Sequence, residues 1–359
     1  MDSSLRRFKK GETMTDLLSM TKPDLEALMS QLGEKRFVAA QLFSWLHKQR
    51  VTSFDEMTNL SKALREKLKN NYVISSCSIA KKLVSVYDDT VKYLFELQDG
   101  ERIESVVMKY KYGYTICVSS QVGCKMGCTF CASGIAGFVR NLLPGEILSQ
   151  VYTAARDLDI RISHIVMMGV GEPLDNFDNV LRFLHLITDE SGYGLSMRNI
   201  SLSTCGIVPG IYRLMEEKLQ LTLSVSLHAP NDQIRSRTMP VNRRYSIVQL
   251  LAACRDYTKE TGRRISFEYA LIAGVNDSDA CAQELADRLH GMLCHVNLIP
   301  VNSVKERDYT RSDTARIKGF MHVLETRRIN ATVRRTLGSD INASCGQLRR
   351  GEGPGSEAG

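Results

Sequence analysis

The sequence contains no run of about 18 apolar residues, the length that a membrane-spanning helix requires, so we expect no membrane span. Its first ten residues carry four Lys or Arg, and no apolar stretch that could act as a signal peptide follows them. We therefore expect a cytoplasmic protein. Because that compartment is reducing, the ten cysteines indicate metal binding or catalysis more than structural disulfides.

A second absence concerns the pairing of cysteines. Cys124, Cys128 and Cys131 have the spacing C-x3-C-x2-C, without the second C-x2-C pair that structural zinc sites usually have. The nearest other cysteine, Cys117, lies seven residues upstream on an expected strand. Three thiolates can instead bind three irons of a [4Fe–4S] cluster and leave the fourth iron open to a substrate or cofactor. The spacing favours this cluster over a zinc site or over buried thiols that are close by chance.

The chain has little net charge for its 359 residues: it is +7 at pH 7, which is weak evidence for an anionic partner. Six arginines and one acid lie between residues 326 and 350, namely Arg327, Arg328, Arg334, Arg335, Arg349, Arg350 and Asp340. This segment is either a solvated basic face or a contact for a phosphate backbone. Residues 351–359 are rich in Gly, Glu and Ser, which is typical of a disordered tail.

Local patterns divide the chain into four parts. Residues 1–75 show helical apolar spacing and capping signals, and they predict a small basic helical module that packs on something larger. Residues 76–113 alternate apolar and polar side chains around a turn, which predicts a β-hairpin extension. Residues 114–338 alternate strands and helices and form the core. Residues 339–359 form a C-terminal segment that ends in the disordered tail.

The core pattern predicts an α/β fold. Strands are expected at 114–119, 162–168, 200–204, 221–227, 265–271, 294–299 and 331–336. Helices are expected near 144–157, 176–189, 209–217, 246–260, 278–290 and 312–326. Alternating units of this length imply a parallel sheet, open or barrel-like, with helices outside.

Several chemically useful residues lie at the ends of the expected strands or directly after them. They are the cysteine loop, the segment Gly169–Pro173, Ser203, Ser226, His228 and Asn302. In parallel sheets ligands collect at the carboxyl ends of the strands, so these residues could line one pocket. The alternatives are that Gly169–Pro173 is only a turn, that the polar residues are routine loop positions, and that His228 is a structural histidine.

Taken together, the motifs resemble a known family. The cysteine spacing with Phe130 before the last cysteine is similar to the signature of the radical S-adenosylmethionine superfamily. The tracts Val118–Cys124, Gly171–Pro173, Ser226–Ala229, Asn297–Asn302 and Asp340–Leu348 resemble the RlmN family of adenine-C2 RNA methyltransferases. The similarity runs from about residue 15 to 350. It implies a partial (β/α)6 radical-SAM barrel and an RNA-binding role for the helical module.

The resemblance also assigns roles by position. It implies that Cys124, Cys128 and Cys131 bind the [4Fe–4S] cluster, and that S-adenosylmethionine is bound by Gly171, Glu172, Ser203, Ser226, Leu227, His228 and Asn302. Cys345 would carry a methyl group, Cys117 would form a transient disulfide with it, and Glu104 would be the proton acceptor. The alternatives from the residues alone are a surface strand glutamate for Glu104 and a free thiol in a mobile tail for Cys345.

The implied reaction uses two molecules of S-adenosylmethionine per turnover and an electron donor such as flavodoxin or ferredoxin. The implied substrates are an adenine in the peptidyl-transferase region of 23S rRNA and, in some members, an adenine beside the tRNA anticodon loop. A monomer is expected. Two rivals are a Cfr-type methyltransferase that acts on adenine C8, and a non-catalytic iron–sulfur or zinc protein that binds RNA.

Overall fold

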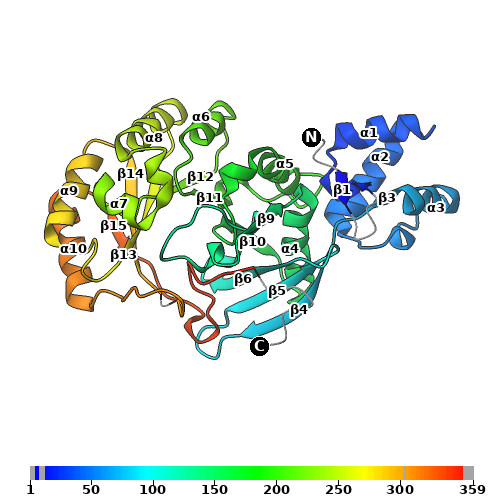
Figure 1. Cartoon of the computed structure of the whole chain (residues 1–359). Coiled ribbons are helices and arrows are strands. Elements are labelled where there is room, and N and C mark those ends of the chain that lie inside the picture. Colours follow the sequence, from blue (N-terminus) through cyan, green and yellow to red (C-terminus); the bar gives the residue numbers. More distant parts are fainter. Residues whose placement is uncertain (1–4, 8–12, 303, 351–359) are drawn as a thin grey trace.

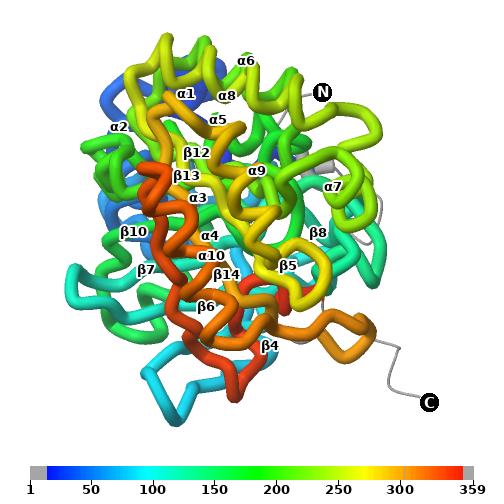
Figure 2. The backbone as a smooth tube through the Cα atoms, turned by 90° about the vertical axis from the view of Figure 1, so that its left-hand side faces the viewer, coloured from blue at the N-terminus to red at the C-terminus, as the bar shows by residue number. Residues whose placement is uncertain are grey.

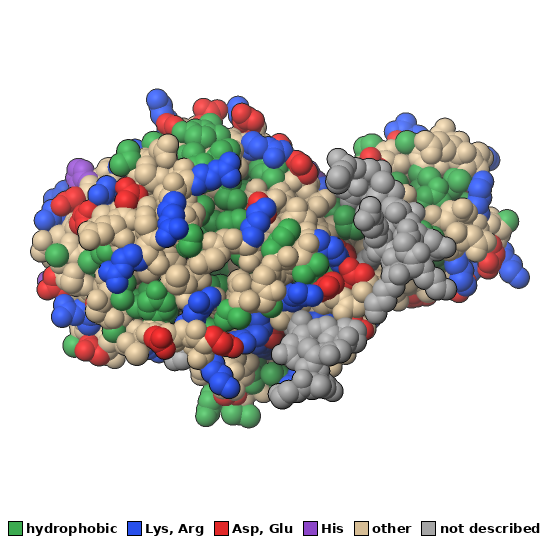
Figure 3. All heavy atoms as spheres, in the orientation of Figure 1, with side chains coloured by type: hydrophobic (Ala, Val, Ile, Leu, Met, Phe, Trp, Pro, Cys, Tyr) green, Lys and Arg blue, Asp and Glu red, His purple; other side chains and the backbone are tan. Residues whose placement is uncertain are grey.

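The computed structural model describes residues 5–7, 13–302 and 304–350, and the tail at 351–359 lies outside this part of the chain. Figure 1 shows a large lobe built on one sheet and a smaller helical lobe formed by the N-terminal module. Basic and acidic side chains are interspersed over the face shown in Figure 3. Within the described residues, no helix is both long enough and apolar enough to cross a membrane.

The large lobe is organised by a ten-stranded sheet with the order β15-β14-β13-β12-β11-β10-β7-β6-β5-β4. Seven neighbouring strands are parallel: β7 (Gly113–Cys117), β10 (Ile162–Met167), β11 (Ile200–Thr204), β12 (Thr222–Ser226), β13 (Ile265–Leu271), β14 (Cys294–Pro300) and β15 (Ala331–Val333). All seven were predicted from their short apolar runs. Except for β15, they are mostly buried, as expected for strands that helices cover.

Six helices connect consecutive parallel strands: α4 (Pro144–Asp157), α5 (Phe177–Thr188), α6 (Val208–Glu216), α8 (Ile247–Thr261), α9 (Asp279–Leu289) and α10 (Thr314–Thr326). They confirm the predicted (β/α)6 arrangement, and they lie outside the sheet (Figures 1 and 2). Three of them, α8, α9 and α10, begin at a residue whose side chain caps the helix. In α8, for example, Ser246 and Gln249 form a capping box, and Gly262 ends the helix with a φ of 63°.

The predicted hairpin extension consists of three antiparallel strands, β4 (Cys77–Val84), β5 (Val91–Leu97) and β6 (Arg102–Tyr110). Because β6 pairs with β7, the extension and the core share one sheet without a linker. The edge strand β4 was not predicted. Most of its side chains are exposed on both faces, so its sequence lacks the alternation that marks a half-buried strand.

The helical module contains α1 (Lys22–Gln31), α2 (Arg36–Phe43) and α3 (Lys62–Asn71), beside a small sheet of β1 (Leu5–Arg7), β2 (Thr13–Asp16) and β3 (Tyr72–Val73). Directly after α2 the chain continues as a π-helix over Ser44–Gln49, which was not predicted. The module packs on the large lobe as expected. Its buried residues and those of the sheet form one continuous hydrophobic core.

Two further segments differ from the prediction. A short helix, α7 (Asp232–Thr238), follows β12; it was missed because its sequence is mostly polar. The last strand ends at Val333, three residues before the predicted end at Thr336. From Arg334 the chain leaves the sheet and runs across to the β4–β6 extension, as the red segment in Figure 1 shows. We call residues 334–350 the C-terminal strap.

Candidate active site

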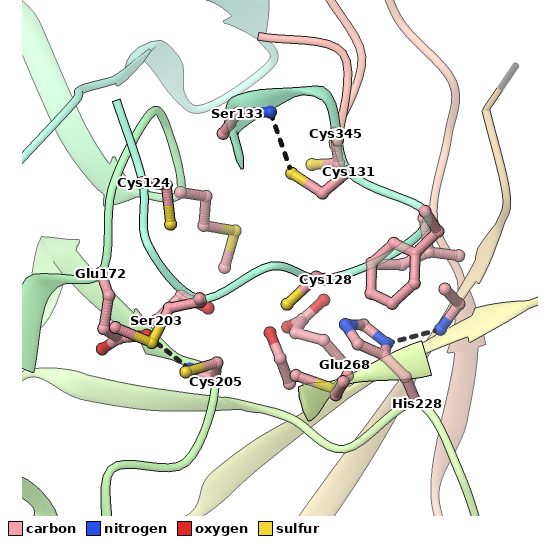
Figure 4. A pocket seen from close by; sticks show the side chains of 18 of the residues that line it. Cys124, Cys128, Cys131, Ser133, Glu172, Ser203, Cys205, His228, Glu268 and Cys345 are labelled. Atoms are coloured by element: carbon pink, nitrogen blue, oxygen red, sulfur yellow. Dashed lines mark hydrogen bonds between the residues drawn. The ribbon is translucent and has the colours of Figure 1, made fainter. Parts of the chain in front are cut away.

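A cavity with an empty volume of about 940 Å³ lies at the carboxyl ends of the parallel strands. We call it the cysteine cavity because Cys124, Cys128 and Cys131 all line it. Figure 4 shows their three sulfur atoms arranged around one hollow. Of the residues expected to bind a cofactor, the cavity is also lined by Gly171, Glu172, Ser203, Ser226, His228 and Asn302. The strand-end prediction is thus confirmed as a spatial grouping.

The cysteine loop is held by the two-stranded ribbon of β8 (Gln121–Gly123) and β9 (Phe138–Asn141). Gly123, the last residue of β8, has a φ of 77°, and a Cβ there would collide with the carbonyl oxygen of Gly137. Only glycine fits that position. The loop is tied to the strap as well, because the Ala132 amide donates a hydrogen bond to the Gly346 carbonyl at 2.8 Å.

Two thiols of the cysteine loop, Cys124 and Cys128, lie in surroundings that disfavour their charged form. The pKa of Cys124 is raised to about 11, mainly by burial and in smaller part by the charge of the neighbouring Cys131. Burial, followed by the charges of Cys131 and Cys124, also raises the pKa of Cys128. Thiolates so placed need a cationic partner, which iron would supply. Among the described residues, no three His, Cys, Asp or Glu side chains converge as ligands of a single metal ion.

The loop after β10 presents a buried carboxylate to the cavity. Gly171 has a φ of 106°, and a Cβ there would lie 2.6 Å from Gln121 Cβ, so no side chain fits. Glu172 accepts hydrogen bonds from the amides of Leu174 at 3.0 Å and Cys205 at 2.7 Å. Burial raises the pKa of Glu172. The carboxylate is therefore rigidly placed, and an ammonium group would be a favourable neighbour.

His228 serves the structure and the cavity together. Its Nδ1 accepts a hydrogen bond from the Ala270 amide at 2.8 Å, which leaves the proton of the neutral ring on Nε2. Burial lowers the pKa of His228 to about 3, so the ring is neutral at physiological pH. The ring lies edge-to-face with Phe130, with centroids 4.9 Å apart. Leu227, in contrast, is fully buried and does not line the cavity; its carbonyl accepts from Arg235 Nε.

Cys345 lies where the cysteine cavity meets a second cavity of about 540 Å³. We call the second one the thiol cavity, because it is lined by both Cys345 and Cys117, whereas Cys117 does not line the first. In this structure both are free thiols. Cys345 is fixed by Asn302, whose Nδ2 donates to the Cys345 carbonyl at 3.0 Å. The alternative of a thiol in a mobile tail is therefore wrong.

The thiol pair has an arginine beside it. Burial raises the pKa of Cys345, and the Arg334 guanidinium opposes that rise. Burial also raises the pKa of Cys117 to about 12, with the charge of Cys345 adding to it and Arg334 opposing it. Arg334 lines both cavities and lies 3.8 Å from Glu268. Arg334 therefore offsets part of the effect of burial, more for Cys345 than for Cys117, and makes the Cys345 thiolate easier to form than burial alone would.

Glu104 is buried, so the alternative of a surface strand glutamate is wrong. Its carboxylate lies 2.8 Å from Lys92 Nζ and accepts a hydrogen bond from the Arg349 amide at 2.9 Å. It lines neither cavity, although its strand neighbour Val106 and the strap residue Leu348 line the thiol cavity. The structure therefore places Glu104 behind the wall of that cavity.

Most of the six arginines between residues 326 and 350 form ion pairs with carboxylates. Arg327 pairs with Asp287, Arg349 with Glu306 and Arg350 with Glu101, at distances of 2.7 to 3.0 Å. Arg334 is directed inward, as described above. For these four, a structural role is favoured over a phosphate contact.

Three residues of the site were not predicted: Arg235, Glu268 and Arg334. Arg235 is fully buried and donates to the carbonyls of Leu227, Cys205 and Ser226, so it holds two strand ends together. Glu268 lines the cysteine cavity from inside β13. An acid within an otherwise apolar strand was a usable signal for Glu268. Arg235 and Arg334 resemble ordinary surface arginines in sequence.

The comparisons with known proteins agree with this geometry. The "Ribosomal RNA large subunit methyltransferase N-terminal domain" family matches residues 15–74, and the "Radical SAM superfamily" matches residues 118–286. Two similar proteins, both named "Probable dual-specificity RNA methyltransferase RlmN", come from Clostridium novyi and Clostridium tetani. They are 52% and 54% identical over 337 residues, which is 94% of this chain and 98% and 96% of theirs.

A solved structure supports the same conclusion. The crystal structure of a radical SAM methyltransferase from Sphaerobacter thermophilus matches with a TM-score of 0.89 and 46% identity. The match covers 93% of this chain and 98% of that one. These relatives and this solved structure therefore match nearly the whole chain, beyond the segments that the two family models cover. The chain belongs to the RlmN family of radical S-adenosylmethionine-dependent RNA methyltransferases.

Proposed function

We propose that this protein methylates C2 of one adenine in the peptidyl-transferase region of 23S rRNA, and C2 of an adenine beside the tRNA anticodon loop. The second substrate class is suggested by the words "dual-specificity" in the names of the relatives. One observation carries the proposal. Cys345 faces the cavity of the three cysteines and also the cavity of Cys117, as a carrier between two chemical steps must.

The cysteine cavity would hold the cofactors. Cys124, Cys128 and Cys131 would bind a [4Fe–4S] cluster, and S-adenosylmethionine would be bound by Gly171, Glu172, Ser203, Ser226, Leu227, His228 and Asn302, the Leu227 contact being through its backbone. Together, when bound, they supply the 5′-deoxyadenosyl radical that removes hydrogen from an unreactive methyl group. Glu172 would pair with the ammonium end of the cofactor, and neutral His228 would donate from Nε2 into the cavity.

The two thiols would act in different steps of the reaction. Cys345, as a thiolate favoured by Arg334, accepts a methyl group from a first S-adenosylmethionine. Once one hydrogen atom has been removed from the methyl group on Cys345, the resulting methylene carbon bonds to C2 of adenine, and the adduct gives up one electron, which the cluster would accept. Glu104 takes the C2 proton. The Cys117 thiolate then bonds to the Cys345 sulfur and breaks the bond between that sulfur and the methylene carbon, which takes up one proton and becomes the methyl group of the product. The two cysteines are left as a disulfide, which an external thiol reductant must reopen before the next turnover. One electron enters from a donor such as flavodoxin or ferredoxin.

The distinguishing experiment is nucleoside analysis of both RNA classes. We delete the gene, express the protein again, and digest rRNA and tRNA for mass spectrometry. The expected result is loss of 2-methyladenosine on deletion and its return on expression. 8-Methyladenosine without 2-methyladenosine would replace the proposal by the Cfr-type alternative. Formation of 2-methyladenosine in rRNA alone would remove tRNA from the proposal.

The remaining parts of the proposal concern the setting of the reaction. We expect a cytoplasmic monomer. Its helical module, which forms the smaller lobe, would bind RNA outside the barrel. The base must leave its stack to reach the buried thiols, as in other enzymes that act on a base. Because the family is one of methyltransferases, the non-catalytic RNA-binding protein is set aside.

A further inference from the structure

The turn between β6 and β7 has an unusual composition for a surface hairpin. Residues 109–112 read Lys-Tyr-Lys-Tyr, and Gly113 follows with a φ of 124°. The rings of Tyr110 and Tyr112 are stacked, with centroids 5.0 Å apart and an angle of 6° between their planes. The His164 ring lies edge-to-face with the Tyr112 ring, with centroids 4.7 Å apart. The two tyrosines therefore form a preassembled aromatic stack.

The stack leads from solvent to the reacting thiols. Tyr112 is 61% exposed, whereas Tyr110 lines the thiol cavity together with Cys117 and Cys345. Burial raises the pKa of the Tyr110 hydroxyl, and the Arg334 guanidinium, which lines the same cavity, opposes that rise. The two tyrosines therefore offer aromatic stacking partners along the path from solvent to the active-site cavity. A base that leaves its stack in the RNA needs such partners.

Positive charge surrounds the stack. Lys109 and Lys111 alternate with the two tyrosines, and Arg335 lines the thiol cavity next to Tyr110. Lys109 approaches Asp89 only at 3.8 Å, and both side chains are more than half exposed. Within the described residues, no ion pair joins Lys111 or Arg335 to a carboxylate. These cations are therefore available to phosphates, unlike the paired arginines elsewhere in the strap.

We infer that Tyr112, Tyr110, Lys111 and Arg335 form an RNA-docking platform, on which a nucleobase next to the target adenine stacks on Tyr112 while Lys111 and Arg335 contact its phosphates. This inference rests on the proposed function and names how that site receives its substrate. Aromatic rings interleaved with cations are the usual surface for single-stranded nucleic acid, since every base offers a π-face. A protein partner would not require the cations beside the cavity.

The chain offers a matched control. Tyr87, in the turn between β4 and β5, is 76% exposed and is also the only other tyrosine of the extension in a turn. It lines neither cavity, and it is followed by Asp88 and Asp89, which would repel phosphate. Replacement of Tyr87 therefore removes a ring of the same size from the same sheet without touching the platform.

The test uses the full chain with its cluster reconstituted, and a stem-loop RNA of the peptidyl-transferase region with 2-aminopurine next to the target adenine. Stacking on a tyrosine quenches 2-aminopurine fluorescence. We expect Tyr112→Ala to weaken binding about tenfold and to abolish the quenching, and Tyr112→Phe to stay within about twofold of wild type. Tyr87→Ala should match wild type. Lys111→Gln should reduce the slope of log Kd against log salt concentration by about one, because one phosphate contact is lost.

The outcomes separate this inference from the proposed function. Unchanged quenching and Kd in Tyr112→Ala, or an equal loss in Tyr87→Ala, would overturn the platform even if the RNA is methylated. Quenching that depends on Tyr112 supports the platform even if no 2-methyladenosine forms, and in that case the proposed reaction fails alone. Circular dichroism of each variant checks its fold, and Lys111→Gln keeps the test valid if Tyr112→Ala unfolds.

Discussion

At the scale of single residues, the site depends on which charges lie beside which thiols. Arg334 is the cation shared by Cys345 and Cys117, and it is itself held near Glu268. Interactions of this kind are strong because the groups are removed from water. The residues that could be recognised from sequence, the cysteines, therefore depend on an arginine that could not.

The first prediction concerns Arg334. Because its charge lowers the pKa of the Cys345 thiol, Arg334→Gln should raise that pKa and reduce the thiolate fraction at pH 8. We expect alkylation of Cys345 by iodoacetamide to slow roughly tenfold, which corresponds to an interaction of about 1.4 kcal/mol. Mass spectrometry of the peptide containing Cys345 measures the rate. Arg334→Lys keeps the charge and serves as the control; an unchanged pH–rate profile in Arg334→Gln would contradict the assignment.

The second prediction concerns Cys117. Without its thiol, the proposed bond between Cys345 and the RNA has nothing to break it, so Cys117→Ala should accumulate a covalent protein–RNA adduct through Cys345. Denaturing gels followed by peptide mass spectrometry detect the adduct. Cys254→Ala is the matched control, because Cys254 is also buried but lines neither cavity. Recovery of free RNA alone from Cys117→Ala would argue against the disulfide step.

The third prediction separates two roles of Glu104. As a proton acceptor it should matter to the reaction, and as the partner of Lys92 it should matter to stability. We expect Glu104→Gln to lower methylation at least about 100-fold. Its free energy of unfolding should fall by about 3 kcal/mol, since Lys92 stays buried without a charge partner.

Lys92→Met is the control for Glu104, because it breaks the same ion pair but leaves the carboxylate. It should lose comparable stability in urea unfolding while keeping methylation within about tenfold of wild type. If both variants lose methylation in proportion to their stability, Glu104 acts only as a structural residue.

At the scale of elements, the contact between the helical module and the barrel contains a buried histidine. His47 lies in the π-helix after α2, its ring 4.4 Å from Phe43, and its Nδ1 is 3.2 Å from the Tyr152 hydroxyl in α4. Burial lowers the pKa of His47 to about 3. The neutral ring is therefore required for the two lobes to pack.

This arrangement gives the fourth prediction. Because the folded-state pKa lies below the unfolded value of about 6.5, the contribution of His47 is complete above pH 6.5 and is lost as pH falls toward 3. When the pH is lowered from 7 to 5, protonation of His47 in the unfolded chain should decrease the free energy of unfolding by about 2 kcal/mol. Urea unfolding at both pH values measures the loss, and His47→Gln should reduce it by that amount. An identical pH dependence in the variant would contradict this role.

Elements also show what could be predicted from the sequence. The parallel strands and their helices were found because each is a short apolar run or an amphipathic repeat, and burial enforces such patterns. The edge strand β4 was missed because few of its side chains are buried. The π-helix was missed because it depends on packing against the barrel, not on local spacing. Site residues at strand ends were found by topology. Arg334 was missed because it follows the last strand, where only the fold defines the direction of the chain, whereas Glu268 lies within a predicted strand and was simply overlooked.

At the scale of the whole molecule, the strap connects the two ends of the sheet. It leaves β15 at one edge and is held at the other by β4–β6 and the turns beside them. Ser85 Oγ donates to Asp340 at 2.7 Å, the Gly338 amide donates to Asp88 at 2.8 Å, and Lys92 Nζ donates to the Asn342 carbonyl at 3.0 Å. Figure 2 shows the strap passing over this region. The wall of the thiol cavity is thus made by segments far apart in sequence.

The fifth prediction tests these ties. The double variant Asp88→Ala/Asp340→Ala removes two of them, so the amides of residues 338–350 should exchange hydrogen about tenfold faster, because local opening becomes easier. Methylation should fall, since Cys345 is less firmly placed. Hydrogen exchange followed by mass spectrometry measures the first effect. Asp89→Ala is the control, as Asp89 pairs with Lys109 and not with the strap; equal protection in all three proteins would mean that other contacts fix the strap.

The strap also determines when the molecule can become reactive during its synthesis. Cys117 and Cys345 are separated by 345 − 117 = 228 positions. At about 5–20 residues per second, the ribosome needs about 11 to 46 s to add them. During that interval Cys117 has been made, but the thiol that faces it has not. The two thiols therefore come together only in a nearly finished chain, and a chain that stops before residue 334 lacks Cys345 and every strap residue that lines the thiol cavity.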